Sequence, residues 1–172
     1  MNNSSISSAS EYRPKVFSDM IGQDAIVKTL SNAIKNDNIP QALLFCGPRG
    51  VGKTSCARIL AKTINDLKEN FEYNIFELDA ASNNSVEDIR NITDQIRIPP
   101  QIGKYKVYII DEVHMLSNAA FNAFLKSLEE PPKHVVFILA TTEKNKIIPT
   151  ILSRCQIYDF KKVDIESITK LL

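Results

Sequence analysis

Residues 47–54 constrain the fold of this 172-residue chain more than any other stretch. They spell G-P-R-G-V-G-K-T and match the pattern G-x-x-x-x-G-K-[S/T] of a loop that binds phosphate groups. An apolar run of strand type, residues 42–46, precedes the loop, and apolar residues at helical spacing follow it from Ala57 to Ile64. Because the motif works between a strand and a helix, these flanks favour a phosphate-binding loop over a glycine-rich turn that matches by chance.

The residue types of this loop suit the chemistry of phosphate binding. Glycines let the backbone turn its N–H groups toward a phosphate, and the positive end of the following helix adds to the attraction. The Lys53 ammonium is expected between the β- and γ-phosphates, and the Thr54 hydroxyl is expected to hold Mg²⁺. Lys53 is also expected to lie in a solvent-facing loop and to support no part of the core. The residues expected to bind the nucleotide are Gly47, Pro48, Arg49, Gly50, Val51, Gly52, Lys53, Thr54 and Ser55.

Composition narrows the classes of partner. Lys and Arg number 21 and Asp and Glu number 20, so a net charge of +1 leaves any DNA contact to a local patch. Apolar residues make up 44% of the chain without a run as long as a membrane span. The cysteines Cys46, Cys56 and Cys155 form no C-x-x-C pair, which argues against disulfides or a zinc site and favours a reducing cytoplasm. His114 and His134 are expected to be structural.

Apolar runs alternate with helical patterns along the chain. Fully apolar runs suit parallel strands covered on both faces, so the alternation predicts an α/β domain of three layers around a five-stranded parallel sheet. Ser85 and Asp88 match a capping box, and Ser117 can cap the next helix. The expected strands are 42–46, 74–79, 106–112, 135–140 and 156–160, and the expected helices start near residues 21, 54, 85, 117 and 164.

Polar side chains end two of the apolar runs. Asp111 and Glu112 follow four apolar residues at the carboxyl end of an expected strand, the edge where open parallel sheets bind ligands. Asp111 can hold Mg²⁺ through water there, and Glu112 can orient and deprotonate an attacking water. Thr142 closes another run at the same edge and could bond the γ-phosphate or the water, although threonine at a strand end is ordinary. From the residues alone, Arg154 is expected to pair with an acid or extend into solvent.

These motifs, in this order, resemble the AAA+ module of bacterial clamp loaders, and more narrowly that of their gamma/tau-type subunits. The resemblance covers about residues 12–160. It rests on F-S-D-M-I-G-Q, the phosphate loop, D-A-A-S-N-N, D-E-V-H-M-L, L-E-E-P-P, A-T-T and S-R-C. It divides the chain into a disordered lead-in (1–11), an AAA+ P-loop ATP-binding domain (12–161) and the start of a truncated helical lid (162–172).

The resemblance implies that the domain binds ATP with Mg²⁺ and hydrolyses it. It assigns Lys53 and Thr54 to the bound ATP·Mg²⁺ and Asp111 to the metal. It assigns Glu112 to water activation and Thr142 to sensing of the γ-phosphate.

Two further roles, an arginine finger and an adenine pocket, come from the resemblance alone. Arg154 matches the arginine finger that reaches the ATP of a neighbouring subunit. Arg13, Val16 and the turn at residues 21–22 match the segment that lines the adenine pocket.

The implied partners are the other subunits of a hetero-oligomeric ring, a sliding clamp and primer–template DNA, with no membrane. DNA contacts should fall mainly on the phosphate backbone, because loading must work at any sequence. Asn83, Asn84, Ser85 and Arg90 are candidates for those contacts, and an ordinary capped helix explains them equally well.

Two departures from the family pattern bear on function. Residues 65–73 replace a four-cysteine zinc module, and the chain ends just inside the expected lid. A branch-migration helicase would share the phosphate loop and the acids but not L-E-E-P-P with S-R-C. A ring component that binds nucleotide without hydrolysis remains an alternative, although Glu112 disfavours it.

Overall fold

The computed structural model describes residues 13–66, 69 and 73–163. The lead-in expected at 1–11 and the helix expected from residue 164 therefore lie outside the described residues. The centre of the domain is a single sheet whose five strands run parallel in the order β2-β3-β4-β1-β5. The strands are β1 (Ala42–Cys46), β2 (Ile75–Asp79), β3 (Lys106–Asp111), β4 (Val135–Thr141) and β5 (Gln156–Asp159).

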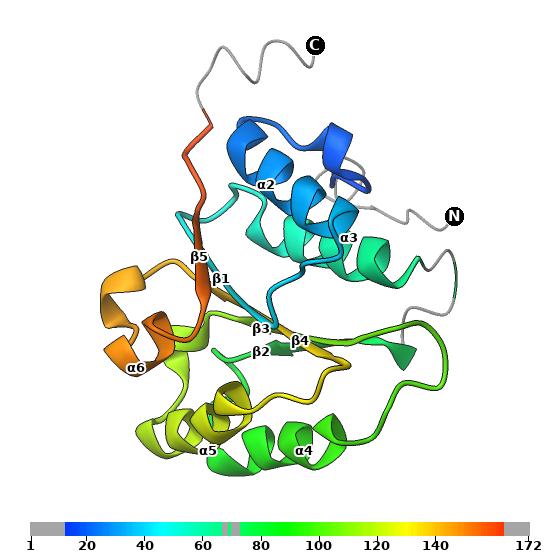
Figure 1. The fold of residues 1–172 in the computed structure, drawn as a ribbon. Coiled ribbons are helices and arrows are strands. Elements are labelled where there is room, and N and C mark those ends of the chain that lie inside the picture. The colour runs from blue at the N-terminus through cyan, green and yellow to red at the C-terminus, as the bar shows by residue number, and fades with distance from the viewer. Residues whose placement is uncertain (1–12, 67–68, 70–72, 164–172) are drawn as a thin grey trace, which may run out of the picture.

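Helices cover both faces of the sheet and complete three layers (Figure 1). One face carries α2 (Asp24–Lys35) and α3 (Lys53–Asn65), and the other carries α4 (Val86–Ile96) and α5 (Asn118–Glu129). The predicted three-layer α/β fold is thus confirmed. Shorter elements are the four-residue helix α6 (Pro149–Leu152) and the 3-10 turns η1 (Phe17–Asp19), η3 (Val113–Met115) and η4 (Lys144–Lys146). No helix in the described part of the chain is both long and apolar enough to cross a membrane.

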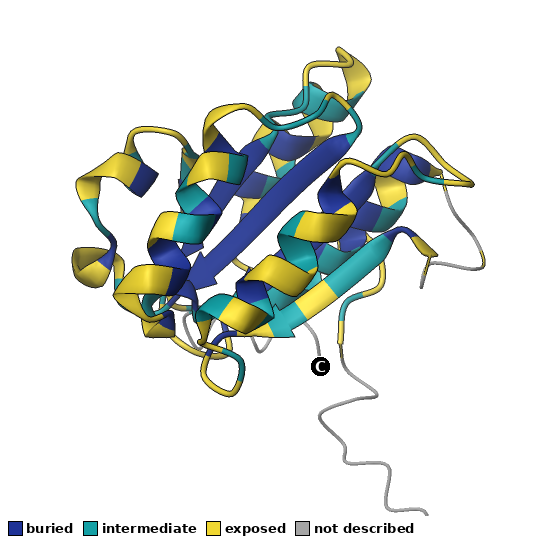
Figure 2. Ribbon diagram, turned by 90° about the horizontal axis from the view of Figure 1, so that it is seen from below, coloured by how far each residue is buried: buried dark blue, intermediate teal, exposed yellow. Residues whose placement is uncertain are grey.

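Alternate residues of the interior strands fill two cores. Leu43 and Phe45 of β1 belong to the core beneath α2 and α3, whereas Leu44 packs with Phe124 and Phe137 beneath α4 and α5. Every residue of β1 and of β4 is buried, and in Figure 2 the interior strands are buried throughout while the helices expose their outer sides. Full burial of one apolar side chain of this kind stabilises the fold by about 1.5–3 kcal/mol, so packing on both faces stabilises the sheet.

Side-chain caps define where two helices begin. At α4, the Ser85 hydroxyl accepts a hydrogen bond from the Asp88 N–H (3.2 Å), and the Asp88 carboxylate accepts one from the Ser85 N–H (3.2 Å). The predicted capping box is therefore confirmed. At α5, the Ser117 hydroxyl accepts from the Ala120 N–H at 3.1 Å, as predicted.

The carboxyl end of α4 is held by two side chains from the sheet side. Buried Lys106 donates to the Gln95 carbonyl at 2.5 Å, with its ammonium 5.5 Å from the ring centre of Phe76. His134 Nε2 lies 2.8 Å from the Ile96 carbonyl oxygen. These contacts satisfy carbonyls that a helix end leaves without an internal partner, and they give His134 the structural role predicted for it.

The three cysteines lie on separate elements and are free thiols. Cys46 and Cys56 are buried and Cys155 is half-buried. Burial raises the thiol pKa to about 11 for Cys46, about 12 for Cys56 and about 11 for Cys155, so these thiols stay protonated at neutral pH.

Candidate active site

The phosphate loop connects the carboxyl end of β1 to α3, whose first residue is Lys53. Gly50 and Gly52 have φ angles of 78° and 97°, a left-handed backbone that glycine adopts without the clash that a side chain would cause. A Cβ added at Gly50 would meet nothing within 4 Å, so the loop borders open space. The fold therefore leaves room for a phosphate group at the start of α3, where the helix dipole favours an anion.

Lys53 lies in the predicted loop but is itself buried, with 6% of its surface exposed, although the loop was expected to face solvent. Its Nζ donates to the carbonyl oxygens of Gly47 (2.5 Å) and Pro48 (2.7 Å), because the loop curls around the ammonium. Burial lowers the pKa of Lys53, and the charges of Glu112 and Asp111 oppose that shift. Phosphate oxygens above the loop would be stronger acceptors for this ammonium than neutral carbonyls are.

Thr54 and Asp111 meet across the gap between α3 and β3. The Thr54 hydroxyl donates to Asp111 Oδ2 at 3.2 Å. Hydroxyl and carboxylate oxygens are the donor types that Mg²⁺ takes in nucleotide sites, where it keeps several waters. The pair therefore fits the predicted metal position, on the donor chemistry that the two side chains present.

Glu112 follows β3 directly and adopts a left-handed backbone, with φ 51° and ψ 46°. Its Oε2 accepts a hydrogen bond from the Thr142 hydroxyl at 3.0 Å. The same oxygen lies 3.4 Å from Nε2 of His114. The fold thus brings together the two predicted residues, Glu112 and Thr142, and adds a histidine that was predicted to be structural.

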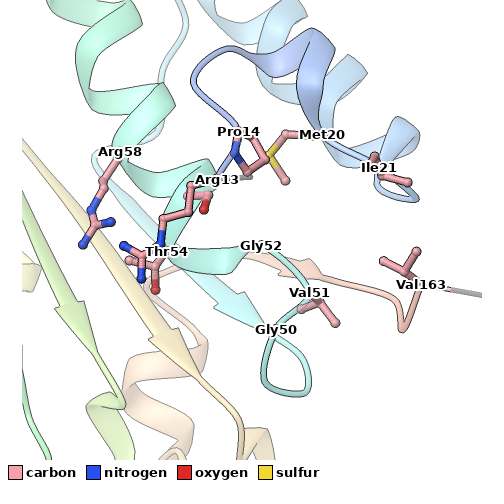
Figure 3. A pocket seen from close by; sticks show the side chains of 11 residues that line it. Arg13, Pro14, Met20, Ile21, Gly50, Val51, Gly52, Thr54, Arg58 and Val163 are labelled. Carbon is pink, nitrogen blue, oxygen red and sulfur yellow. The ribbon is translucent and has the colours of Figure 1, made fainter. Parts of the chain in front are cut away.

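Two adjoining cavities border the loop and share Gly50 and Thr54. The smaller cavity, of about 310 Å³, is lined mainly by charged residues, among them Asp111 and Glu112. The larger, of about 520 Å³, lies between the segment before α2 and the phosphate loop, and Val163 approaches it from the other end of the described chain (Figure 3). The smaller is lined by Arg49, Gly50, Lys53, Thr54, Asp79, Ala81, Asp111 and Glu112. The larger is lined by Arg13, Pro14, Met20, Ile21, Gly50, Val51, Gly52, Thr54, Ser55, Arg58 and Val163.

The shape of the larger cavity suits a flat apolar ring linked to a chain of phosphates. Pro14, Met20, Ile21 and Val51 supply apolar surface, and Arg13 lines it as predicted. Val16 is not one of its lining residues, and 51% of Val16 is exposed. The assignment of Val16 to the adenine pocket therefore stays a prediction.

Arg154 lies at the opposite edge of the sheet, two residues before β5 begins. Its guanidinium donates to Glu129 Oε1 (3.0 Å) at the end of α5 and to the Thr150 carbonyl (2.9 Å). In a parallel sheet the start of β5 is one strand length away from the phosphate loop that follows its neighbour β1. Arg154 is thus paired with an acid, as the residues alone predicted, and it does not join the cavities at the loop.

Asp79 and His114 line or touch the site without having been singled out. Asp79 ends β2 and pairs in register with Asp111 of β3, which brings it into the smaller cavity. The final acid of N-I-F-E-L-D was the signal for Asp79, since it ends a predicted strand at the ligand-binding edge. The signal for His114 was its place two residues after Glu112, although sequence separation alone does not say that the two side chains meet.

The candidates for DNA contact lie around the start of α4. Asn84, Ser85 and Arg90 are exposed and Asn83 is half-buried. The Ser85 hydroxyl is engaged by Asp88, and the Asn83 amide donates to the Asp79 carbonyl at 3.2 Å. Asn84 and Arg90 are therefore the more suitable of the four to meet a phosphate.

A family model described as DNA polymerase III, delta subunit, matches residues 22–75 and 72–164. The chain belongs to this family. Within the family, it is 49% identical to the DNA polymerase III subunit tau of Bacillus subtilis over 91% of its length. It is 44% identical to subunit tau of Escherichia coli and 44% identical to subunit gamma of Buchnera aphidicola subsp. Baizongia pistaciae, over 93% of its length in each case. The predicted gamma/tau resemblance is thereby confirmed.

The chain spans about a third to a half of the length of these curated relatives: 31%, 28% and 48%, respectively. Among solved structures, a gamma-subunit-related protein of Thermotoga maritima matches with a TM-score of 0.69 and 26% identity, over 80% of this chain and 47% of that one. The Holliday junction branch migration motor RuvB of the same organism matches with a TM-score of 0.73 and 22% identity, over 93% of this chain and 52% of RuvB. The RuvB likeness concerns the AAA+ fold alone, so the family relationship favours a clamp-loader subunit over a branch-migration motor.

Proposed function

We propose that this domain binds ATP with Mg²⁺ and hydrolyses it as part of a DNA polymerase III clamp-loader subunit of the gamma/tau type. One observation carries the proposal: Lys53, Thr54, Asp111 and Glu112 line a single cavity at the carboxyl edge of the sheet. The fold family uses that edge for nucleotides. The larger cavity beside it has apolar walls for the base.

Binding follows from the loop. Backbone N–H groups at the start of α3 and the Lys53 ammonium would hold the phosphates. Thr54 and Asp111, whose oxygens are 3.2 Å apart, would hold the magnesium ion, Asp111 through water. Held by these residues, the ion would offset the charge that develops on the phosphates during transfer.

Hydrolysis is assigned to Glu112 and Thr142. The Glu112 carboxylate lines the same cavity as Lys53 and would accept a proton from the attacking water. The Thr142 hydroxyl, which donates to Glu112 at 3.0 Å, is placed to exchange that bond for one to the γ-phosphate or the water. In this ATPase mechanism, the bond from Thr142 would keep Glu112 from acting as a base until the γ-phosphate of ATP is bound.

Arg154 is assigned to a neighbouring subunit's ATP. Arg154 lies at the edge of the sheet where the strands begin, which argues against a role at its own phosphate loop. Its pairing with Glu129 keeps the guanidinium at a surface that a neighbouring subunit can cover. A cation supplied in trans stabilises the transition state of phosphoryl transfer. ATP hydrolysis by one subunit would then depend on ring assembly, and the isolated domain would turn ATP over slowly.

The partners proposed for the whole protein are the other subunits of the ring, a sliding clamp and primer–template DNA. The cytoplasm is the proposed location, because the relatives are DNA polymerase subunits. ATP binding would shape a ring that opens the clamp and grips DNA, and hydrolysis would release both. Asn84 and Arg90 at the start of α4 are the proposed contacts to the DNA backbone.

Replacing Lys53 tests the proposal. Lys53→Met keeps the apolar stem and removes the charge, and we expect its affinity for ATP to fall by roughly tenfold to hundredfold, the worth of a hydrogen bond from a charged donor. The measurement is titration with ATP and Mg²⁺ beside a thermal melt of each protein. Lys62→Met on the same helix is the matched control and should bind ATP as the wild type does. Unchanged affinity in Lys53→Met would refute the phosphate-loop assignment.

A further inference from the structure

The imidazole of His114, a half-buried residue, lies between Glu112 and Thr141. Its side chain is 6% exposed, and Thr141 is fully buried at the end of β4. Nδ1 of the imidazole lies 2.8 Å from the Thr141 hydroxyl, and Nε2 lies 3.4 Å from Glu112 Oε2. The ring therefore joins the end of β4 to the carboxylate at the end of β3.

The contacts of Thr141 and Glu112 bear on which ring nitrogen of His114 carries the proton. The Thr141 hydroxyl oxygen already accepts from the Glu143 N–H at 3.0 Å. When the hydroxyl proton points to Nδ1, the imidazole carries its own proton on Nε2, directed at Glu112. The other neutral tautomer would set the Nε2 lone pair against a carboxylate oxygen, which is repulsive. Thr141 and the charge of Glu112 thus together favour the tautomer that carries its proton on Nε2.

The backbone is shaped to bring Glu112 and His114 together. Glu112 has a positive φ of 51°, and the turn η3 closes behind it with a hydrogen bond from the Met115 N–H to the Glu112 carbonyl at 2.9 Å. A left-handed conformation costs a residue with a side chain roughly 1–2 kcal/mol. Such a residue persists where its surroundings hold it, and these residues cluster at functional sites.

We propose that His114 and Thr141 are positioning residues that orient the Glu112 carboxylate for water activation. The Thr142 hydroxyl donates to Oε2 of Glu112, and Nε2 of His114 lies 3.4 Å from the same oxygen, a contact longer than an ordinary hydrogen bond. Their convergence fixes the plane of the carboxylate and leaves Oε1 to take the proton of the water. When Thr142 turns to the γ-phosphate, His114 remains as the donor that keeps Glu112 in line. Contacts of this kind are often long before substrate binds and shorten in the reacting complex. This inference rests on the proposed ATPase function.

Two amide variants separate the roles of the ring nitrogens. The side-chain amide of His114→Gln can reach the place of Nε2, whereas the shorter amide of His114→Asn reaches only the place of Nδ1. In the full-length protein assembled with its partner subunits, we expect His114→Asn to lower kcat by roughly tenfold to hundredfold, the worth of one hydrogen bond to a charged group. We expect His114→Gln to stay within about threefold of wild type, less than the effect of one such bond. KM and the affinity for ATP should be unchanged in both.

Thr141→Val is the third variant, because valine keeps the shape and removes the hydroxyl that helps to favour this tautomer. Its kcat should fall between the values for the two amide variants, with ATP affinity unchanged. Wild-type kcat in His114→Asn would overturn the inference. Equal losses in both amide variants, together with lowered melting temperatures, would also overturn it and leave His114 structural.

Wild type and Glu112→Gln, assayed in parallel, distinguish failure of the inference from failure of the proposed function. If wild type hydrolyses ATP and Glu112→Gln does not, the function stands and the His114 variants decide the inference. If the two hydrolyse equally, Glu112 is not the base, and both the function and the inference are overturned.

Discussion

At the edge of the sheet where the strands end, the candidate catalytic side chains Lys53 and Glu112 each have close partners within the domain. At the edge where the strands begin (the amino edge), the candidate Arg154 has only an exposed partner. Lys53 is buried among loop carbonyls, and Glu112 has two partners within 3.4 Å in a left-handed turn. Arg154, by contrast, is about one-third exposed, and its partner Glu129 is about half exposed. An exposed pair of this kind contributes about 0–1 kcal/mol, so a stronger anion can displace Glu129.

In the proposed mechanism, this difference separates groups that act on the subunit's own ATP from a group that acts on a neighbour's ATP. The groups proposed to act on the domain's own ATP are prearranged, because catalysis gains from dipoles that need not reorganise. A group that acts on a neighbour's ATP cannot be prearranged by its own domain, since its target lies on another chain. It needs a weak resting partner that assembly can replace. Mutations at the two edges should therefore fail in different ways.

Arg154→Ala has the largest expected effect. In a ring, it should slow hydrolysis at the adjoining subunit's site by roughly 10³- to 10⁵-fold, the usual worth of an arginine finger. Hydrolysis at the mutant subunit's own site should be unaffected, which rings of mixed wild-type and mutant subunits would show. Lys133→Ala removes an exposed charge from the same edge and serves as the control. A loss confined to the mutant's own site would abolish the contrast between the edges.

Glu112→Gln has the next largest expected effect. The amide keeps the shape of the carboxylate but cannot take a proton, so turnover in the assembled ring should fall by about 10²- to 10⁴-fold while ATP stays bound. Single-turnover hydrolysis and retention of labelled ATP measure the two quantities. Glu143→Gln, in the next strand's loop, is the matched control and should hydrolyse at the wild-type rate. Loss of ATP binding in Glu112→Gln would place this residue in binding rather than catalysis.

Lys106→Met has the smallest expected effect and bears on stability alone. The variant removes the bond to the Gln95 carbonyl at the end of α4, a cost that relief from burying a cation partly offsets. We expect the free energy of unfolding to fall by about 1 kcal/mol, with ATP affinity unchanged. Urea denaturation measures the former, and exposed Lys104→Met is the control, with no expected change. Weaker ATP binding in Lys106→Met would link the amino edge to the nucleotide site.

Local patterns in the sequence were sufficient to predict the elements and the loop. The phosphate loop, the five strands and the caps at Ser85 and Ser117 are each defined within about a dozen neighbouring residues. Apolar periodicity and capping chemistry act over that range, so they can be recognised without the fold. The place of Asp111 and Glu112 at a strand end was predictable for the same reason.

The tertiary structure alone decided which of these groups meet. Strand order β2-β3-β4-β1-β5 places β4 between β3 and β1, and this sets Thr142 and Thr141 beside Glu112 and His114. Sequence alone did not show that Lys53 is buried or that His114 lies beside Glu112 and Thr141, because it shows neither the curl of the loop nor the ends of distant strands. Pairing between strands that lie 30 residues apart depends on backbone hydrogen bonds and shared burial, which local periodicity does not encode.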